Sequence, residues 1–289
     1  MDTAELLKRV RKIEIKIKGL SKHIFSGEYH SAFKGRGMSF SEVRAYQPGD
    51  DVRNIDWSVT ARTGSPHIKV FEEERELTVL LLVDVSNSVW FGTKANTKNE
   101  IITELSATLA FSAIQNNDNV GLLFFSDEIV KFISPQKGRQ HILRIIRELI
   151  DVRPSATKTS LEKALQYLNQ LVKKKAIIFI ISDFICENYA NALTIAARKH
   201  DVVGIRVIDE KEVSLPKIGL INVYDAETGK ITLLDTNDEK VRNLYRDQMQ
   251  HYYNYFKTAF SKAQADSFQL FTHESYIQAL LGFFKKRSH

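Results

Sequence analysis

The chain has 289 residues, of which 43% are hydrophobic and 26% charged, so it can bury a core of domain size and does not have the composition of a disordered protein. Its single cysteine, Cys186, excludes an internal disulfide and is typical of a reducing compartment. The net charge of +6 permits an anionic partner, but the basic residues are scattered, which disfavours nucleic-acid binding. The apolar runs are only as long as strands, and the first residues intersperse charges, so we expect a cytoplasmic protein without a membrane span.

Residues 1–76 are predicted to form an amino-terminal helix followed by a small antiparallel β layer. The apolar positions between residues 3 and 20 fall on a helical stripe, although the second half also alternates like a strand. Residues 38–46 and 68–71 alternate as well, and the pair Pro48-Gly49 suits the centre of a type II turn. We therefore expect short strands here, outside the main sheet.

Residues 77–289 alternate strand-like and helix-like segments, which is typical of βαβ units. We predict strands at 78–83, 119–125, 129–133, 176–182, 202–207 and 268–271, and helices at 99–115, 139–150, 161–172, 189–199 and 276–284. Residues 218–224 and 230–234 are predicted to form a hairpin with its turn at 227–229, and Thr236-x-x-Glu239 a capping box that opens a long helix. The prediction is an α/β fold with a doubly wound, mainly parallel sheet and a carboxyl-terminal extension, to which residues 1–76 are appended.

Five oxygen-bearing side chains follow predicted strands or precede a predicted helix. Asp84, Ser86 and Ser88 come after the continuous apolar strand 78–83, Thr159 lies in the loop before a helix, and Asp183 follows the strand 176–182. Ligands of parallel sheets bind beyond the carboxyl ends of the strands. Hard oxygen donors favour Mg²⁺ or Mn²⁺, with Ca²⁺ as an alternative, and disfavour zinc or copper. Two carboxylates with neutral hydroxyls leave room for a carboxylate from a partner, so the sequence predicts a cation site that a partner completes.

Each of these residues also has a purely structural interpretation. An Asp-x-Ser-x-Ser segment can be a turn or a helix cap, and Thr159 with Glu162 fits a capping box. Asp183 can be an ordinary strand-end aspartate. The presence of all five in order, each at a predicted strand or loop end, favours the cation site.

The pattern Asp84-x-Ser86-x-Ser88, then Thr159, then Asp183 resembles the metal-ion-dependent adhesion site of a von Willebrand factor type A domain, over about residues 77–208. The resemblance implies that the hydroxyls are direct or near-direct ligands and that the aspartates bind directly or through water. The chain departs from the family in having Lys158 before the threonine and Phe184 after the second aspartate, where glycine is usual. The ammonium of Lys158 could reach such a site and compete with a metal ion.

The segment from Arg44 to Trp57, followed by Ala61–Thr63 and Phe71–Arg75, is similar to a widespread bacterial family that carries a domain of unknown function called DUF58, next to or overlapping a von Willebrand A fold. The resemblance implies work alongside a MoxR-type AAA+ ATPase, as an adaptor or in assembling or activating a client protein. It covers, with the domain that follows, most of the chain.

The same segment concentrates opposite charges in a short span. They are either an internal ion-pair network or a docking surface for a partner, with Trp57 expected as an apolar anchor. The charged residues concerned are Arg44, Asp50, Asp51, Arg53, Asp56 and Arg62. The acidic run Glu72, Glu73, Glu74 and Glu76 is interpreted as a solvated rim.

The leading functional hypothesis is a non-enzymatic interaction module that binds an acidic side chain of a protein partner through its metal ion. The alternative is a Mg²⁺-dependent phosphohydrolase that uses the strand-end aspartates. Phosphatases that form an aspartyl-phosphate usually carry a second aspartate two residues after the first, where this chain has Ser86. Nucleotide hydrolysis by the chain itself is not supported, because the sequence has no Gly-x-x-x-x-Gly-Lys-Ser/Thr loop.

Overall fold

The structure is a computed structural model that describes residues 39–72, 77–92, 97–153, 158–224 and 231–287. The described residues fall into two compact units, one within residues 39–72 and one within residues 77–287. The helix predicted within residues 3–20 and the turn predicted at 227–229 lie outside the described ranges. Within those ranges, no helix combines the length and the apolar content that crossing a bilayer requires.

The small unit is a two-stranded antiparallel sheet of β1 (Ser39–Ala45) and β2 (His67–Glu72), as predicted. The turn at Pro48-Gly49 has the expected geometry, because Gly49 has a φ of 108° and the Asp50 amide donates to the Gln47 carbonyl at 3.0 Å. The connection also holds a short helix, α4 (Trp57–Thr63), which the sequence analysis did not predict. Asp56 caps its first turn, and Gly64 ends it with a φ of 74°.

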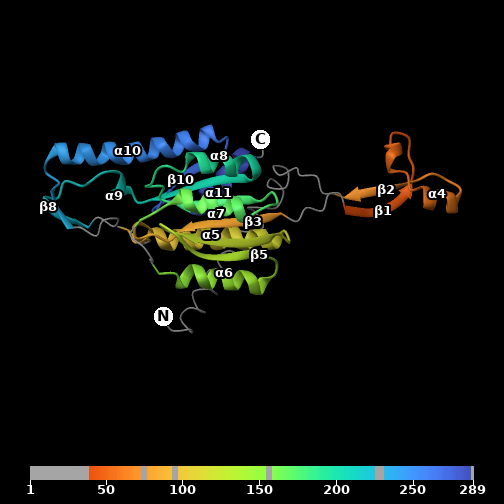
Figure 1. Cartoon of the computed structure of the whole chain (residues 1–289), viewed down its shortest axis with the longest axis horizontal. Helices are drawn as coiled ribbons and strands as arrows, with labels where there is room; N and C mark the ends of the chain where they lie inside the picture. Colours follow the sequence, from red (N-terminus) through yellow and green to blue (C-terminus); the bar gives the residue numbers. More distant parts are fainter. Residues whose placement is uncertain (1–38, 73–76, 93–96, 154–157, 225–230, 288–289) are drawn as a thin grey trace. The chain divides into compact units, whose positions relative to one another are not determined.

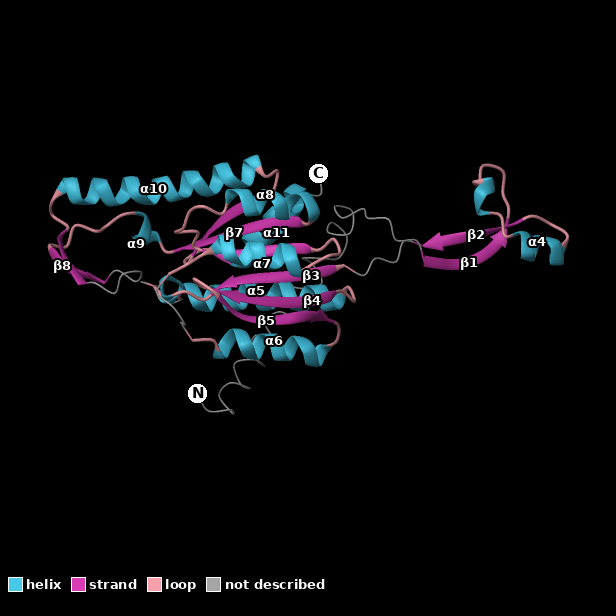
Figure 2. Ribbon diagram, in the orientation of Figure 1, coloured by secondary structure: helices cyan, strands magenta, loops and turns pink. Residues whose placement is uncertain are grey.

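The large unit is built on a six-stranded sheet in the order β10-β7-β6-β3-β4-β5 (Figure 2). All neighbouring pairs are parallel except β4 with β5, which form a hairpin. The predicted α/β class is therefore confirmed. The strands are β3 (Thr78–Asp84), β4 (Asn119–Phe125), β5 (Ile129–Gln136), β6 (Ile177–Ser182), β7 (Asp201–Ile208) and β10 (Asp266–Phe271).

Helices cover both faces of this sheet, which is why β3 and β6 are apolar at almost every position (Figure 1). On one face α7, α8 and α10 pack on Leu80, Leu82 and Ile180. On the other face α5 packs on β3 and β4 and contacts α6 and α11. The helices are α5 (Lys98–Gln115), α6 (Arg139–Asp151), α7 (Leu161–Leu171), α8 (Ala190–Lys199), α10 (Glu239–Lys262) and α11 (Tyr276–Arg287).

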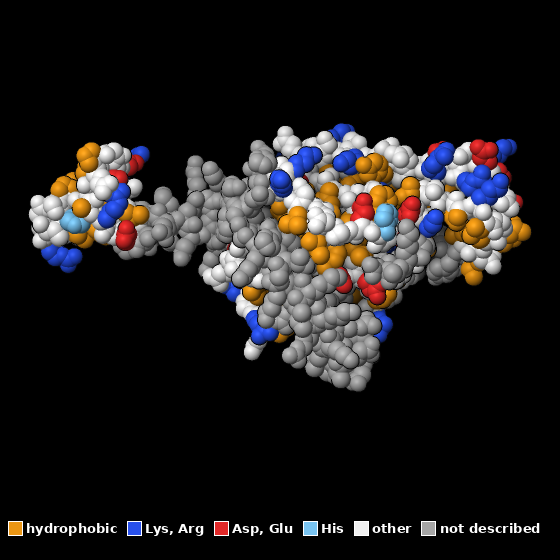
Figure 3. Space-filling model, turned by 180° about the vertical axis from the view of Figure 1, so that it is seen from behind, with side chains coloured by type: hydrophobic (Ala, Val, Ile, Leu, Met, Phe, Trp, Pro, Cys, Tyr) orange, Lys and Arg blue, Asp and Glu red, His pale blue; other side chains and the backbone are white. Residues whose placement is uncertain are grey.

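Between β7 and α10 the chain forms a four-residue helix, α9 (Glu210–Val213), and the predicted hairpin, β8 (Leu220–Tyr224) with β9 (Ile231–Asp235). The capping box predicted at Thr236-x-x-Glu239 is wrong. Asp238 caps α10, whereas the Thr236 hydroxyl donates to the Gly219 carbonyl at 2.7 Å and closes the base of the hairpin. The hairpin exposes Leu220, Ile231 and Leu233, and Figure 3 shows apolar side chains gathered at this end of the unit.

Candidate functional site

The two aspartates predicted to bind a cation lie at the switch point of the sheet. Asp84 is the last residue of β3 and Asp183 follows the last residue of β6, and these two strands are neighbours. After β3 the chain continues to α5 on one face, and after β6 to α8 on the other, so the connections diverge between the two strand ends. A divergence of this kind is where open α/β sheets bind ligands. Both carboxylates are buried, with exposures of 0% and 1%.

The loop after β3 holds its hydroxyls close to Asp84. The Ser86 amide donates to one Asp84 carboxylate oxygen at 2.9 Å, and the Ser182 hydroxyl donates to the other at 2.6 Å. The hydroxyls of Ser86 and Ser88 are 3.1 Å apart. Ser86 stands at the start of a short 3₁₀ turn, Asn87–Trp90, but its side chain makes no capping hydrogen bond. The helix-cap interpretation therefore does not account for the Ser86 hydroxyl.

Asp183 is held by groups from three elements. One carboxylate oxygen accepts the Ile185 amide at 3.2 Å, the other accepts the Lys98 ammonium at 2.9 Å, and the Asp183 carbonyl accepts Nε of Arg206 at 3.0 Å. The next residue, Phe184, has a φ of 53°, a conformation that costs a bulky side chain energy. It is where the resembling family usually has glycine.

Packing holds Phe184 in this conformation. Its fully buried ring lies 4.6 Å from the ring centroid of Phe256 and 5.6 Å from that of Phe260, both in α10. Tyr189 adds a third aromatic neighbour at 6.0 Å. The backbone beside Asp183 is thus fixed by the core of the unit.

Lys98 is the main site residue that the sequence analysis missed. It is the first residue of α5, its side chain is fully buried, and its ammonium contacts both Asp183 and, at 2.6 Å, Glu212. Glu212 belongs to α9, where its other oxygen accepts the Asp209 amide at 2.9 Å. One signal was present in the sequence: Lys98 continues the buried stripe of α5, three and four residues before Ile101 and Ile102, where a lysine is out of place.

The pKa values of the carboxylates in this cluster are shifted in different directions. Burial raises the pKa of Asp84 to about 6, and the nearby charge of Asp183 adds to the rise. Burial alone would raise the pKa of Asp183 as well, but the Lys98 ammonium outweighs it and holds that pKa below its ordinary value. Burial raises the pKa of Glu212 despite its contact with Lys98. Asp183 is therefore neutralised from within the chain, whereas Asp84 is not.

Thr159 lies on the loop before α7 but is not joined to the other four predicted ligands by a hydrogen bond in the described part of the chain. The cap of α7 is Ser160, not Thr159, so the capping-box interpretation of Thr159 with Glu162 is wrong. The Ser160 amide donates to the Ser126 carbonyl at 2.7 Å, which fixes the loop at the end of β4, the strand beside β3. Thr159 lines a cavity of about 300 Å³ with Ser160, Glu162, Ile185, Cys186, Glu187, Asn188 and Tyr252.

Some of the predicted ligands suit a hard divalent cation. The buried oxygens of Asp84 and Ser86, beside the Ser88 hydroxyl, are of the type that Mg²⁺ and Mn²⁺ prefer, and the raised pKa of Asp84 shows a carboxylate that a nearby cation would stabilise. Among the described residues there is no group of three or more His, Cys, Asp or Glu side chains placed to hold a metal ion. A metal here would therefore depend on the hydroxyls. The competing ammonium in contact with the site is that of Lys98, whereas Lys158 is exposed.

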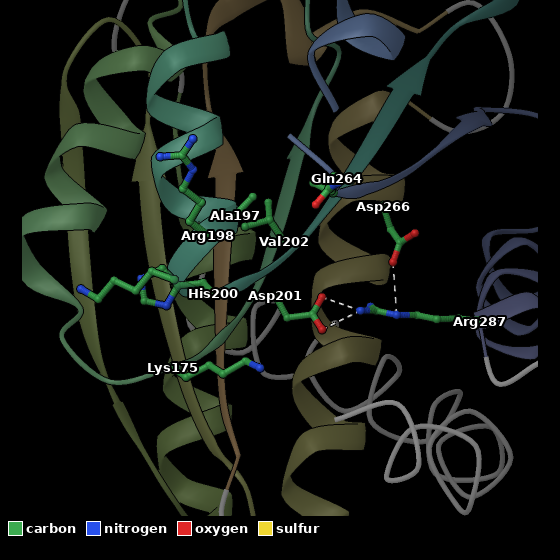
Figure 4. Close-up of a pocket in the computed structure, with 11 residues that line it drawn as sticks. Lys175, Ala197, Arg198, His200, Asp201, Val202, Gln264, Asp266 and Arg287 are labelled. Carbon is green, nitrogen blue, oxygen red and sulfur yellow. Dashed lines mark hydrogen bonds and ion pairs between the residues drawn. The ribbon is translucent and has the colours of Figure 1, made fainter. Parts of the chain in front are cut away.

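A second cavity, of about 290 Å³, lies at the opposite, amino end of the sheet (Figure 4). Asp201, which begins β7, accepts two hydrogen bonds from Arg287 at 2.5 and 2.6 Å, and Asp266, which begins β10, lies 3.2 Å from the same guanidinium. His200 is 3% exposed, and neither of its ring nitrogens has a hydrogen-bond partner among the described residues. The sequence analysis did not single out these residues.

The charged residues of the small unit form local pairs. Arg44 makes two hydrogen bonds of 2.8 Å with Asp50, and Arg53 pairs with Asp51 at 2.8 Å. Both pairs reach solvent, with side-chain exposures of 36% for Arg44 and 87% for Arg53, so they are local surface pairs. The expectation for Trp57 is wrong: its side chain is 71% exposed at the start of α4, so it anchors nothing in the described part of this unit.

Comparisons with known proteins found a similar sequence and similar structures. An uncharacterized protein of Mycobacterium tuberculosis is 31% identical over 234 residues, which are 80% of this chain and 74% of that protein. The structure of an aerotolerance-related membrane protein from Bacteroides fragilis has a TM-score of 0.50 at 14% identity, over 73% of this chain and 98% of that one. A von Willebrand factor type A structure from Catenulispora acidiphila is similar with a TM-score of 0.39 at 8% identity, over 77% of this chain and 43% of that one.

The sequence profile of the family described as "Protein of unknown function DUF58" matches residues 42–253. The match begins within β1 and includes β2 and the strand ends that carry Asp84 and Asp183. It confirms the family predicted from the segment that begins at Arg44. Since the match spans well over half of the sequence, the chain belongs to the DUF58 family.

Proposed function

We propose that this chain is a non-enzymatic protein-interaction module with a divalent cation, Mg²⁺ or Mn²⁺ with Ca²⁺ as an alternative, held by Asp84, Ser86, Ser88, Thr159 and Asp183. The observation that carries the proposal is the buried Asp84 carboxylate beside two hydroxyls, at the switch point of a parallel sheet. Its raised pKa is due first to burial and then to the nearby charge of Asp183, and it supports the proposal because no cationic side chain offsets these two causes.

Each residue has a distinct part in this proposal. Asp84 supplies charge and is oriented by the Ser182 hydroxyl and the Ser86 amide. The Ser86 and Ser88 hydroxyls supply neutral ligands, and Thr159 supplies a third from the loop before α7. A cation bound by few anionic ligands keeps net positive charge and accepts a further carboxylate. The partner would therefore present an aspartate or glutamate.

The resemblance of the segment from Arg44 to Arg75 to DUF58 proteins implies a protein partner, and we propose a MoxR-type AAA+ ATPase and its client as the first candidates, in the cytoplasm. Affinity capture from native cells, with and without chelator, tests this. A partner retained only with Mg²⁺ and lost from the Ser86→Ala variant is expected. Capture that chelator and variant leave unchanged would contradict a role of the metal in recognition.

Calorimetric titration of Mn²⁺ tests the cation site itself. Ser86→Ala removes a proposed ligand and is expected to weaken binding at least tenfold. Ser112→Ala is the control, because Ser112 is also a buried serine but lies in α5 away from the strand ends, and its hydroxyl has no hydrogen-bond partner in the described structure. Equal binding by wild type and Ser86→Ala would remove the metal from the proposal.

A further inference from the structure

The cluster at the carboxyl end of the sheet already contains a cation, the ammonium of Lys98. We propose that Lys98 is the built-in cation of this site, and that a divalent ion binds only when the ammonium leaves Asp183 and rests on Glu212 alone. This inference rests on the proposed function, since it concerns how the same site is filled.

The burial of Lys98 shows that its ammonium belongs to the site. Its side chain has no exposed surface, although lysine is rarely buried unless it is paired. It also stands in the first turn of α5, where the helix dipole disfavours a positive charge. Both costs are offset by two carboxylates, Asp183 at 2.9 Å and Glu212 at 2.6 Å. The ammonium is therefore held by the site and is not a surface charge that happens to lie nearby.

The Lys98 ammonium competes with a metal ion for Asp183. One of its oxygens accepts the Ile185 amide and the other accepts the Lys98 ammonium, so a metal ion bound to this carboxylate would lie within a few ångströms of a positive charge. Like charges at such a separation in a buried site repel strongly. Metal ion and ammonium cannot both neutralise Asp183.

Glu212 offers the Lys98 ammonium a second position. It is the closer of the two partners, and its second oxygen is fixed by the Asp209 amide in the capping box of α9. An ammonium released by Asp183 thus keeps a buried counter-charge without entering solvent. The two carboxylates come from different elements, Asp183 from the end of β6 and Glu212 from α9, so Lys98 can lose one partner and keep the other.

Three variants test the proposal. The affinity of each for Mn²⁺ is measured by titration, with calorimetry and the electron paramagnetic resonance signal of the bound ion as the two readouts. Lys98→Met removes the competitor and is expected to tighten binding at least tenfold. Glu212→Gln removes the alternative partner, which ties the ammonium to Asp183, and is expected to weaken binding at least fivefold. Lys131→Met is the control, since it breaks an exposed pair of 2.6 Å with Glu148 and is expected to change nothing.

The opposite signs of the two changes separate competition from general damage to the site. If Lys98→Met does not fold, Glu212→Gln decides, because it keeps the contact of Lys98 with Asp183; binding as tight as wild type in this variant would overturn the inference. Equal binding by wild type and Lys98→Met would overturn the inference but leave the proposed metal site standing. Absence of Mn²⁺ binding in wild type and all variants would overturn both.

Discussion

The two ends of the six-stranded sheet carry similar side chains in different electrostatic settings. At the amino end, Asp201 and Asp266 both pair with Arg287, whose side chain is 18% exposed, so both carboxylates have a cationic partner and the group is partly solvated. At the carboxyl end, Asp84, Asp183 and the Lys98 ammonium are buried, and Asp84 has no cation of its own. The difference shows why the carboxyl end is the candidate cation site: a bound cation would stabilise a buried carboxylate that has no cationic partner, whereas the carboxylates at the amino end are already paired and partly solvated.

The largest expected effect is the loss of the buried ammonium. Lys98→Met leaves Asp183 and Glu212 buried without their cation, and removal of one member of a buried ion pair costs about 3–5 kcal/mol. We expect chemical denaturation without metal to show a loss of this size. Saturating Mn²⁺ should restore part of this lost free energy of unfolding. A loss below about 1 kcal/mol would contradict the expectation, because it is the size measured for solvent-exposed ion pairs.

The second effect is the pH dependence that Asp84 imposes. Its pKa of about 6 in the folded protein exceeds the ordinary 3.8, so between these values the folded state holds more protons. The free energy of unfolding should therefore fall as the pH rises from 4 to 7, by about 2 kcal/mol from this group alone. Denaturation of wild type and Asp84→Asn across this range measures the difference. If the free energy of unfolding depends on pH in the same way in both proteins, Asp84 has an ordinary pKa.

The amino end should show the opposite slope. Burial lowers the pKa of His200 to about 4, below the ordinary 6.5, so the unfolded state takes up protons first as the pH falls. Lowering the pH from 8 to 5 should therefore reduce the free energy of unfolding by about 2 kcal/mol. This reduction should be absent in His200→Leu. If this variant loses as much stability as wild type over the same range, the ring is protonated or solvated in the folded state.

The smallest effect is expected for Arg287→Ala. The pairs with Asp201 and Asp266 are partly exposed, so we expect a loss of about 1 kcal/mol that shrinks in high salt. Thermal denaturation in low and high salt measures both. A loss as large as that of Lys98→Met would erase the contrast between the two ends.

The sequence predicted the sheet and the strand-end aspartates because both follow local rules. A continuous apolar run such as residues 78–83 predicts a strand covered on both faces, and parallel strands bring their carboxyl ends together. The cation at the site could not be predicted this way. Lys98 meets Asp183 and Glu212 across 85 and 114 residues of sequence, and Glu212 lies on α9, a helix too short to show a periodic pattern.

Local rules also failed where tertiary packing decides. Phe184 adopts a left-handed conformation because Phe256, Phe260 and Tyr189 surround its ring, which no pattern near residue 184 indicates. Thr236 matched a capping box, but its hydroxyl instead donates to the carbonyl of Gly219, the residue before the hairpin that precedes the helix. In both cases the deciding partner is distant in sequence.

The most direct test of the central claim is a crystal structure of the protein with Mn²⁺, in which anomalous scattering locates the ion. We predict a peak among the side-chain oxygens of Asp84, Ser86, Ser88, Thr159 and Asp183, with the Lys98 ammonium on Glu212 and withdrawn from its 2.9 Å contact with Asp183. A peak at this position with the contact of Lys98 to Asp183 intact, or no peak at saturating Mn²⁺, would contradict it.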